Sequence, residues 1–340
     1  MSDRIVRFGI VGAGAIAQSY AQAFEGCGEA RVVAVADVRP AAAAALAKRL
    51  QCRPYDSHQA LAGSLDLDAV LVCTPPASHA EICLHLLARG LHVLCEKPLS
   101  LDVASARSML ETAKRAGVTL TMASKFRYVE DVVRAKNIVL SGILGDIVLF
   151  ENAFTSRVDM STRWNCDPAV SGGGVLIDNG THSVDLMRYF LGPLAEVQVV
   201  EGKRSQQLPV EETVRIFVRS VRGVMGSIDL SWSIDKELES YINIYGSHGT
   251  ASVGWRESKY RQASSRDWVV FGNGYKKIDA LRAQIGNFAR SLRGEDVLLI
   301  TAEEALGSVE VIEAAYASLR ESHWRRMAPE ASLAATAEPR

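Results

Sequence analysis

The sequence predicts two consecutive domains: an α/β domain built on a parallel sheet, then an α+β domain with an open, mainly antiparallel sheet. Up to about residue 124, apolar runs alternate with amphipathic helices, which is typical of a parallel sheet covered on both faces. Later segments alternate apolar and polar residues, as antiparallel strands with one covered face do. The length of 340 residues also favours two domains. We expect these domains to span residues 1–124 and 125–327.

In the first half, five apolar runs predict strands, and the segments between them predict helices. The strands are expected at 5–11, 31–37, 68–74, 91–95 and 118–123. The helices are expected near 14–25, 40–50, 56–62, 77–89 and 100–116. The alanine-rich stretch after Pro40 belongs to a helix, because proline is favourable at the first helical position and alanine has the highest helix propensity.

The turn between the first strand and the first helix reads Gly12-x-Gly14-x-x-Ala17. In such a turn the first small residue allows the bend, the second lets a pyrophosphate approach the backbone, and the third lets helix and strand pack closely. The second strand ends at Asp37, about 20 residues further on, where a carboxylate that binds ribose hydroxyls is expected. These features predict a Rossmann domain that binds a dinucleotide. The alternative, a βαβ unit whose glycine-rich turn holds no ligand, is disfavoured by this context.

The second half is expected to form a sheet with helices on one side. A helix and four strands are expected at 132–140 and at 147–154, 213–218, 224–232 and 241–246, with a turn at 247–249. The final helix begins after Thr301, which forms a capping box with Glu304. Residues 328–340 lack periodicity and are expected to form a loose tail. A large sheet with a helix-free face often buries that face against another subunit, so we expect a homo-oligomer.

The composition argues against several classes of function. The formal net charge of −1 gives no electrostatic basis for general nucleic-acid binding. No apolar run is long enough to span a bilayer, and the chain enters its first strand at once, without a signal peptide. The six cysteines form no CxxC pair and no metal-ligand spacing. We therefore expect a soluble, cytoplasmic protein with reduced cysteines and no metal site.

One candidate reactive group is Lys97, in the segment Cys95-Glu96-Lys97-Pro98 directly after the fourth strand. Ligands of an open α/β sheet bind beyond the carboxyl ends of its strands, so a lysine there can reach both a nicotinamide ring and a substrate hydroxyl. Pro98 restricts Lys97 to extended geometry and permits a cis peptide bond. On position alone, an ordinary surface lysine at a strand end is an equal alternative.

A second candidate is the helix that follows three glycines at 172–174 and runs to Leu191. Its residues Asp178, His182 and Asp185 are spaced i, i+4 and i+7 and therefore lie along one stripe. Such a stripe is usually a solvated surface. A His/Asp pair in an otherwise apolar run favours proton transfer instead, because histidine titrates near neutrality and a carboxylate orients it. No further metal-type ligand stands nearby, so we interpret the pair as acid–base groups.

Together these motifs resemble the Gfo/Idh/MocA family of nicotinamide-dependent oxidoreductases, which includes inositol dehydrogenases and glucose–fructose oxidoreductase. The resemblance covers the chain except the tail. It rests on the glycine turn, the Thr74-Pro75-Pro76…His79 loop, Glu96-Lys97-Pro98 and the Asp178-x-Gly180-x-His182-x-x-Asp185 helix. It implies a Rossmann domain, a substrate domain on an open sheet, and homodimers or homotetramers formed through that sheet. Ala17 replaces the third glycine of the turn, which a small-residue packing site tolerates.

The resemblance also implies roles for individual residues. Lys97, Asp178 and His182 form the implied catalytic set. The implied cofactor-binding residues are Gly12, Gly14, Ala15, Ile16, Asp37, Arg39, Thr74, Pro75, His79, Glu96 and Lys97. The implied substrate-binding residues are Lys97, Arg127, Arg163, Trp164, Asp178 and His182. Arg127 and Arg163, together with Lys125 and Arg157, would suit an anionic group such as a uronate carboxylate or a nucleotide phosphate. The alternative is that these residues are solvated side chains on loops.

The expected activity is hydride transfer between a nicotinamide cofactor and a secondary alcohol or ketone of a sugar, polyol or cyclitol. The Asp37 carboxylate accepts hydrogen bonds from ribose hydroxyls and repels a 2′-phosphate, which favours NAD, while the nearby Arg39 leaves NADP open. Two alternatives stay open. One is a reductase or dehydrogenase of a nucleotide-linked sugar or another non-sugar carbonyl. The other is a non-catalytic NAD(P)-binding sensor or co-regulator.

Overall fold

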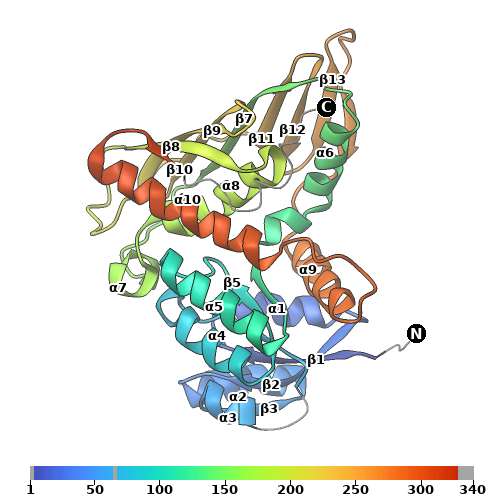
Figure 1. Cartoon of the computed structure of the whole chain (residues 1–340), viewed down its shortest axis with the longest axis vertical. Coiled ribbons are helices and arrows are strands. Elements are labelled where there is room, and N and C mark those ends of the chain that lie inside the picture. The colour runs from blue at the N-terminus through green and yellow to red at the C-terminus, as the bar shows by residue number, and fades with distance from the viewer. Residues whose placement is uncertain (1–3, 64–66, 328–340) are drawn as a thin grey trace. The chain divides into compact units, whose positions relative to one another are not determined.

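The computed structural model describes residues 4–63 and 67–327, which form two compact units (Figure 1). The first unit combines Met1–Glu130, Ala169–Gly172 and Lys276–Val309. The second combines Asp131–Pro168, Gly173–Tyr275 and Glu310–Arg340. The domain bounds expected from the sequence stay predictions, and the expected tail at 328–340 lies outside the described residues.

The first unit contains a six-stranded parallel sheet in the order β3-β2-β1-β4-β5-β6. Its strands are β1 (Val6–Val11), β2 (Ala30–Ala36), β3 (Arg53–Tyr55), β4 (Ala69–Val72), β5 (His92–Glu96) and β6 (Leu120–Ala123). The connecting helices are α1 (Ala15–Phe24), α2 (Pro40–Leu50), α3 (His58–Gly63), α4 (His79–Ala88) and α5 (Val103–Ala116). This order confirms the predicted Rossmann fold, in which ligands bind where the strand order reverses, here between β1 and β4.

A helix from late in the chain, α9 (Lys277–Leu292), completes the core of this unit. Its Phe288 is fully buried, and the ring centroid lies 5.8 Å from that of Phe8 in β1. Phe8 in turn contacts Phe24 of α1, with ring centroids 5.2 Å apart. Leu281 and Ile285 of α9 belong to the same apolar cluster. The nucleotide fold therefore depends on a helix that lies far along the sequence.

The second unit contains a nine-stranded sheet in the order β14-β13-β12-β11-β7-β10-β9-β8-β15. Only the β7–β10 pair is parallel in this sheet, which confirms the mainly antiparallel prediction. Its strands are β7 (Ile147–Thr155), β8 (Leu194–Glu201), β9 (Thr213–Ser220), β10 (Met225–Ser231), β11 (Ser240–Gly246), β12 (Gly249–Gly254), β13 (Ser258–Gln262), β14 (Val269–Gly272) and β15 (Arg325–Arg326). Helix α8 (Val175–Leu191) and nearly all of α6 (Glu130–Leu140) belong to this unit. Helix α7 (Pro168–Ser171) lies mostly in the first unit, and α10 (Ala302–Glu321) belongs to the first unit up to Val309 and to the second from Glu310.

The two faces of this sheet differ. Phe150 of β7 is buried against Phe190 of α8, with ring centroids 5.1 Å apart, so α8 covers the apolar face. On β9, Arg215, Phe217 and Arg219 alternate with buried residues and point to the opposite, exposed face. This alternation is the pattern of an antiparallel sheet with one covered face.

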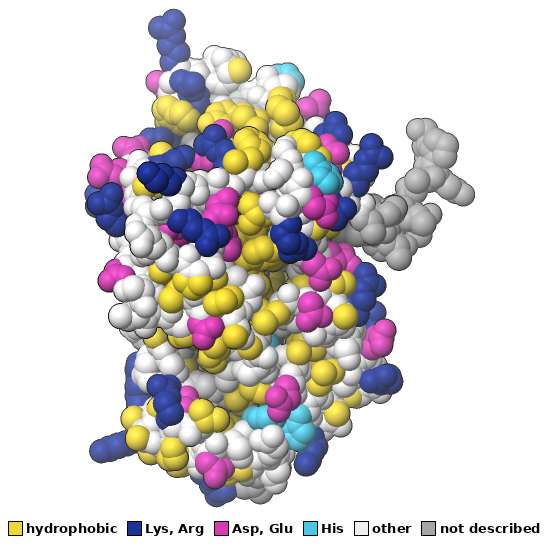
Figure 2. Space-filling view, turned by 90° about the vertical axis from the view of Figure 1, so that its left-hand side faces the viewer, with side chains coloured by type: hydrophobic (Ala, Val, Ile, Leu, Met, Phe, Trp, Pro, Cys, Tyr) yellow, Lys and Arg dark blue, Asp and Glu magenta, His cyan; other side chains and the backbone are white. Residues whose placement is uncertain are grey.

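Acidic and basic side chains are interspersed on the face drawn in Figure 2, without a broad area of one sign. Within residues 4–63 and 67–327, no helix combines the length and apolarity that crossing a membrane requires. The same part of the chain holds no group of three or more His, Cys, Asp and Glu side chains that could bind a metal ion.

Candidate active site

The glycine turn at the carboxyl end of β1 has the geometry that a nucleotide requires. Gly12 adopts a φ of +96°, and a Cβ there would lie 2.7 Å from the carbonyl oxygen of Cys73, so only glycine fits. A Cβ on Gly14 would meet open space. Ala17 is fully buried, as close packing of helix and strand requires. The N-terminus of α1, with its partial positive charge, begins at this turn, so the residues fit a dinucleotide whose pyrophosphate lies beside Gly14.

Asp37 lies just beyond β2 and is tied to the same turn. Its carboxylate accepts hydrogen bonds from the Ala13 backbone N (2.7 Å), the Arg39 backbone N (2.8 Å) and Arg39 Nε (3.2 Å). Burial opposes ionisation of Asp37, but the hydrogen bonds from Arg39 and Ala13 outweigh it and lower the pKa. The carboxylate is therefore ionised at neutral pH and holds Arg39, the residue that leaves NADP open as a cofactor.

The Lys97 segment follows β5 and is fixed through its neighbour Glu96. Glu96 Oε1 accepts a hydrogen bond from the Tyr20 hydroxyl (2.8 Å), and Oε2 accepts one from the Lys97 backbone N (3.1 Å). The Tyr20 hydroxyl also lies 3.0 Å from Gln284 Oε1 of α9. Burial and the nearby Glu96 raise the pKa of Tyr20, so it remains a neutral donor. The Lys97–Pro98 peptide bond is cis, the isomer that the sequence permits.

His79 joins this segment to the loop after β4. Its Nδ1 lies 2.7 Å from the carbonyl oxygen of Pro98, and its Nε2 lies 2.9 Å from that of Thr74. Burial lowers the pKa of His79, although both carbonyl oxygens favour the protonated ring. The structure therefore brings together the predicted Thr74–His79 loop and the Lys97 segment at the carboxyl edge of the parallel sheet.

Helix α8 presents the other candidate groups in a buried setting. His182 is 5% exposed and Asp185 is fully buried, while Asp178 is half-buried. A solvated stripe would be exposed, so that alternative is excluded for His182 and Asp185. Aspartate is almost never fully buried unless it is paired, so the burial of Asp185 indicates a specific role and not a solvated surface.

The glycines before α8 make room for atoms of other elements. A Cβ on Gly173 would overlap the Tyr316 hydroxyl, and a Cβ on Gly174 would overlap the carbonyl oxygen of Glu211. The Glu211 side chain also accepts hydrogen bonds from the backbone N of Gly174 (2.9 Å) and Leu176 (3.1 Å). Sequence reasoning did not single out Glu211 or Tyr316. The available signal was the glycine run itself, which indicates close approach by other groups.

The predicted substrate-binding arginines have different surroundings. Arg127 is 1% exposed, and its Nη1 donates to Glu304 Oε1 at 2.9 Å. Arg163 and Trp164 are exposed in the segment between β7 and α7. Substrate contacts from these three residues stay predictions.

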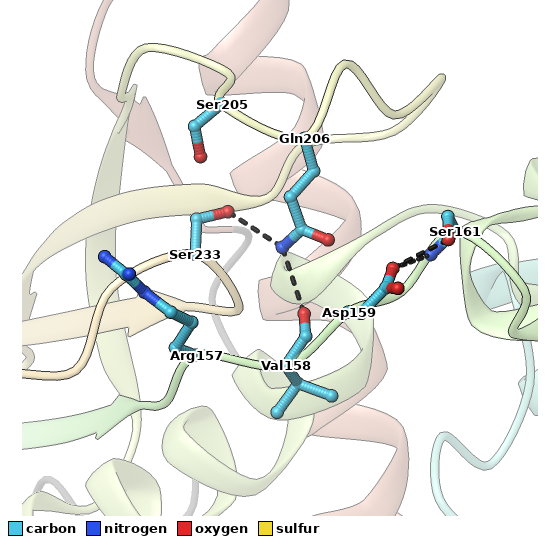
Figure 3. Close-up of a pocket in the computed structure, with 7 residues that line it drawn as sticks. All are labelled: Arg157, Val158, Asp159, Ser161, Ser205, Gln206 and Ser233. Carbon is cyan, nitrogen blue, oxygen red and sulfur yellow. Dashed lines mark hydrogen bonds between the residues drawn. The ribbon is translucent and has the colours of Figure 1, made fainter.

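A pocket of about 500 Å³ lies beyond the end of β7 (Figure 3). It is lined by Arg157, Val158, Asp159, Ser161, Ser205, Gln206 and Ser233. Gln206 Nε2 donates to the Val158 carbonyl oxygen and to Ser233 Oγ, each at 3.1 Å, and Gln206 Oε1 accepts from the Met160 backbone N at 3.1 Å. The Gln206 amide is thus engaged within the wall and holds the loop that follows β7.

Two protein-family models match the chain. The first, described as an oxidoreductase family with an NAD-binding Rossmann fold, matches residues 6–124. The second, described as the GFO/IDH/MocA C-terminal domain, matches residues 132–252. Together the two matches span most of the chain.

Individual proteins show the same likeness. Inositol 2-dehydrogenase of Rhizobium meliloti (strain 1021) is 26% identical over 334 residues, which cover 93% of this chain and 97% of that protein. D-Glucoside 3-dehydrogenase of Escherichia coli (strain K12) is 33% identical over 221 residues, covering 64% of this chain and 62% of that protein. The structure of levoglucosan dehydrogenase in complex with NADH and levoglucosan has a TM-score of 0.89 at 20% identity and covers 96% of this chain and 100% of that one. This last likeness shows a shared fold.

Proposed function

Because the chain belongs to the Gfo/Idh/MocA oxidoreductase family, we propose that it is an NAD-dependent dehydrogenase acting on a secondary alcohol of a sugar, polyol or cyclitol. The observation that carries the proposal is the burial of His182 on α8, in a chain that also has a Rossmann glycine turn and an ionised Asp37. The inositol and glucoside dehydrogenases among its relatives support this class of substrate.

We assign the chemical steps to three side chains. In alcohol oxidation, His182 takes the hydroxyl proton, and Lys97 donates a hydrogen bond to the developing alkoxide. A positive charge beside that oxygen stabilises the anion, and a positioned base contributes about 10²–10⁴-fold. Asp178 orients the imidazole and stabilises its protonated form. A bound nicotinamide would supply the hydride acceptor for this oxidation. Lys97 is the alternative formal proton acceptor.

For the cofactor, we assign the pyrophosphate to the turn at Gly12 and Gly14 and the adenosine ribose to Asp37. Ala15, Ile16, Arg39, Thr74, Pro75, His79, Glu96 and Lys97 complete the proposed cofactor site, as the resemblance implies. An ionised Asp37 accepts hydrogen bonds from ribose hydroxyls and repels a 2′-phosphate, which supports a preference for NAD.

We also propose a homodimer or homotetramer, formed through the exposed face of the nine-stranded sheet, in the cytoplasm. Phe217, Met225 and Tyr245 expose apolar surface on this sheet, and contact between two copies would bury it. The six cysteines are free, which supports a reducing compartment. Sedimentation equilibrium should give a multiple of the chain mass, and a monomer at micromolar concentration would contradict this assembly.

The activity is tested with a panel of polyols, cyclitols, neutral sugars, uronic acids and nucleotide-linked sugars, each with NAD and with NADP. We expect reduced cofactor to form with at least one neutral polyhydroxylated compound and NAD. Turnover of nucleotide-linked sugars alone would favour the alternative substrate class. Tight cofactor binding without turnover of any compound would favour a sensor.

A further inference from the structure

The first turn of α8 is held by one residue that is distant in sequence. A helix begins with backbone amide groups that its own turns cannot satisfy. In α8, the amides of Gly174 and Leu176 donate to Glu211 Oε1 at 2.9 and 3.1 Å, and the amide of Val175 donates to the Glu211 carbonyl oxygen at 2.9 Å. Gly174 is the N-cap residue of α8 and has no side chain to accept these hydrogen bonds. Glu211 supplies the missing acceptors.

The orientation of this carboxylate is fixed from another helix. The Tyr316 hydroxyl of α10 donates to the same Glu211 Oε1 at 2.8 Å. Burial and the neighbouring Glu211 raise the pKa of Tyr316, so the hydroxyl keeps its proton and remains a donor. A negative charge at a helix N-terminus is also favourable to the helix dipole. Glu211 is 5% exposed, and this burial opposes ionisation and raises its pKa.

The next residue, Glu212, serves a different segment. It is fully buried and accepts hydrogen bonds from the Gln206 backbone N (2.9 Å), from Ser205 Oγ (3.3 Å) and from Ser233 Oγ. These three partners line the pocket beyond β7 (Figure 3). Through the Gln206 side chain, which holds Val158 and Met160, Glu212 supports the loop that carries Arg157.

We propose that Glu211 and Glu212 are positioning residues for the reaction proposed above. Glu211 fixes the first turn of α8 and with it Asp178 and His182. Glu212 fixes the loop after β7 and the wall of the pocket that lies beyond β7. Successive residues of an extended chain point in opposite directions, so one dipeptide can reach both segments. Two adjacent buried carboxylates cost free energy unless each is well hydrogen-bonded, and each here accepts several hydrogen bonds. This inference rests on the proposed function.

The kinetic test compares Glu211→Gln and Tyr316→Phe with Glu212→Gln and Ser233→Ala. Glu239→Gln, an exposed carboxylate of the same unit, is the matched control. We expect Glu211→Gln to lower kcat about tenfold to a hundredfold with NAD affinity unchanged, since a 1 Å misplacement can cost about 10²-fold. Tyr316→Phe should act in the same direction, and remains informative if Glu211→Gln fails to fold. Glu212→Gln and Ser233→Ala should raise KM more than they lower kcat.

A second measurement, amide hydrogen exchange, tests how firmly the first turn of α8 is held, independently of catalytic activity. In Glu211→Gln and Tyr316→Phe, amide hydrogen exchange in a peptide spanning 172–180 should be faster than in the wild type, and exchange in 225–231 should not change. Faster exchange with unchanged kcat and KM would overturn the positioning role. Unchanged amide exchange would overturn the proposal that Glu211 and Tyr316 hold the first turn of α8. A wild type that converts no substrate would refute the proposed function. Amide hydrogen exchange would still test whether Glu211 and Tyr316 hold the first turn of α8.

Discussion

At the scale of single residues, the proposed chemistry depends most on Lys97. Its backbone amide is bound by Glu96, which is itself held by Tyr20, so the segment is fixed independently of any ligand. The backbone that carries the Lys97 side chain is therefore held by hydrogen bonds, as a preorganised catalytic group requires.

We expect Lys97→Met to abolish measurable turnover while leaving cofactor affinity nearly intact. In the proposed mechanism the ammonium stabilises the alkoxide, and Lys97 lies on a different segment from the glycine turn proposed to bind the pyrophosphate, so kcat should fall by at least about 10²-fold. Steady-state kinetics and a fluorescence titration with NADH give the two quantities. Lys48→Met, an exposed lysine of the same unit, is the control. Full activity of Lys97→Met would end the assignment.

Asp37 governs the choice of cofactor in this account. In Asp37→Asn the repulsion of a 2′-phosphate is removed and the hold on Arg39 weakens, because the carboxylate that accepts from Arg39 Nε at 3.2 Å becomes neutral. We expect the ratio of kcat/KM for NADP to that for NAD to rise about tenfold or more, since hydrogen bonds to charged groups contribute about 1.5–3 kcal/mol. An unchanged ratio would show that Asp37 does not discriminate.

Residue-scale prediction succeeded where a motif forces one residue type and failed where burial is decided by tertiary contacts. Gly12 could be predicted because only glycine tolerates its positive φ and its contact with Cys73. Glu211 and Glu212 could not, because two glutamates before a strand have the composition of a solvated surface. Only the folded chain brings donors from distant segments to them.

At the scale of elements, α9 stabilises a sheet formed by the beginning of the chain. Phe288→Ala should lower the free energy of unfolding by about 3–5 kcal/mol, the usual cost of truncating a buried phenylalanine. Urea denaturation followed by circular dichroism gives the value. Val297→Ala, at an 82% exposed position, should change it by less than about 0.5 kcal/mol. Equal effects of the two substitutions would contradict the packing of α9 on β1.

The capping of the first turn of α8 by Glu211 adds a pH-dependent contribution to the free energy of unfolding. Burial raises the pKa of Glu211 above its ordinary value of about 4.3, so the folded chain keeps a proton that the unfolded chain releases. The contribution of Glu211 to the free energy of unfolding therefore falls as pH rises from about 4.3 through the raised pKa, and then levels off. Denaturation of the wild type and Glu211→Gln at several pH values should show the wild type losing stability relative to the variant over that range. A relative gain would contradict this sign.

Most elements that the sequence predicts are present in the structure. Two of the missed elements, β3 and α9, show why some could not be predicted. The predicted capping box of α10 is confirmed, with the Glu304 backbone N 3.2 Å from Thr301 Oγ1. β3 was missed because it has three residues and contains Pro54, which an edge strand tolerates. The periodic apolar residues of α9 could have been recognised as a helix. Its packing on β1 could not be predicted, because such a stripe fits any apolar surface.

At the scale of the whole molecule, the residues of the proposed reaction belong to two units. The first unit holds the glycine turn, Asp37 and Lys97, and the second holds Asp178 and His182 on α8. In the proposed reaction a hydride passes from the substrate to the nicotinamide cofactor. The transferred hydrogen is therefore the most informative species to follow.

The central claim is tested most directly by deuterium transfer from a polyol or cyclitol labelled at the carbon that is oxidised. The account predicts reduced nicotinamide that carries one deuterium per molecule, detected by mass spectrometry, and no labelled product with Lys97→Met. Reduced cofactor without deuterium would contradict direct hydride transfer. A wild type that binds NAD but reduces it with no compound of the panel would contradict the proposed activity.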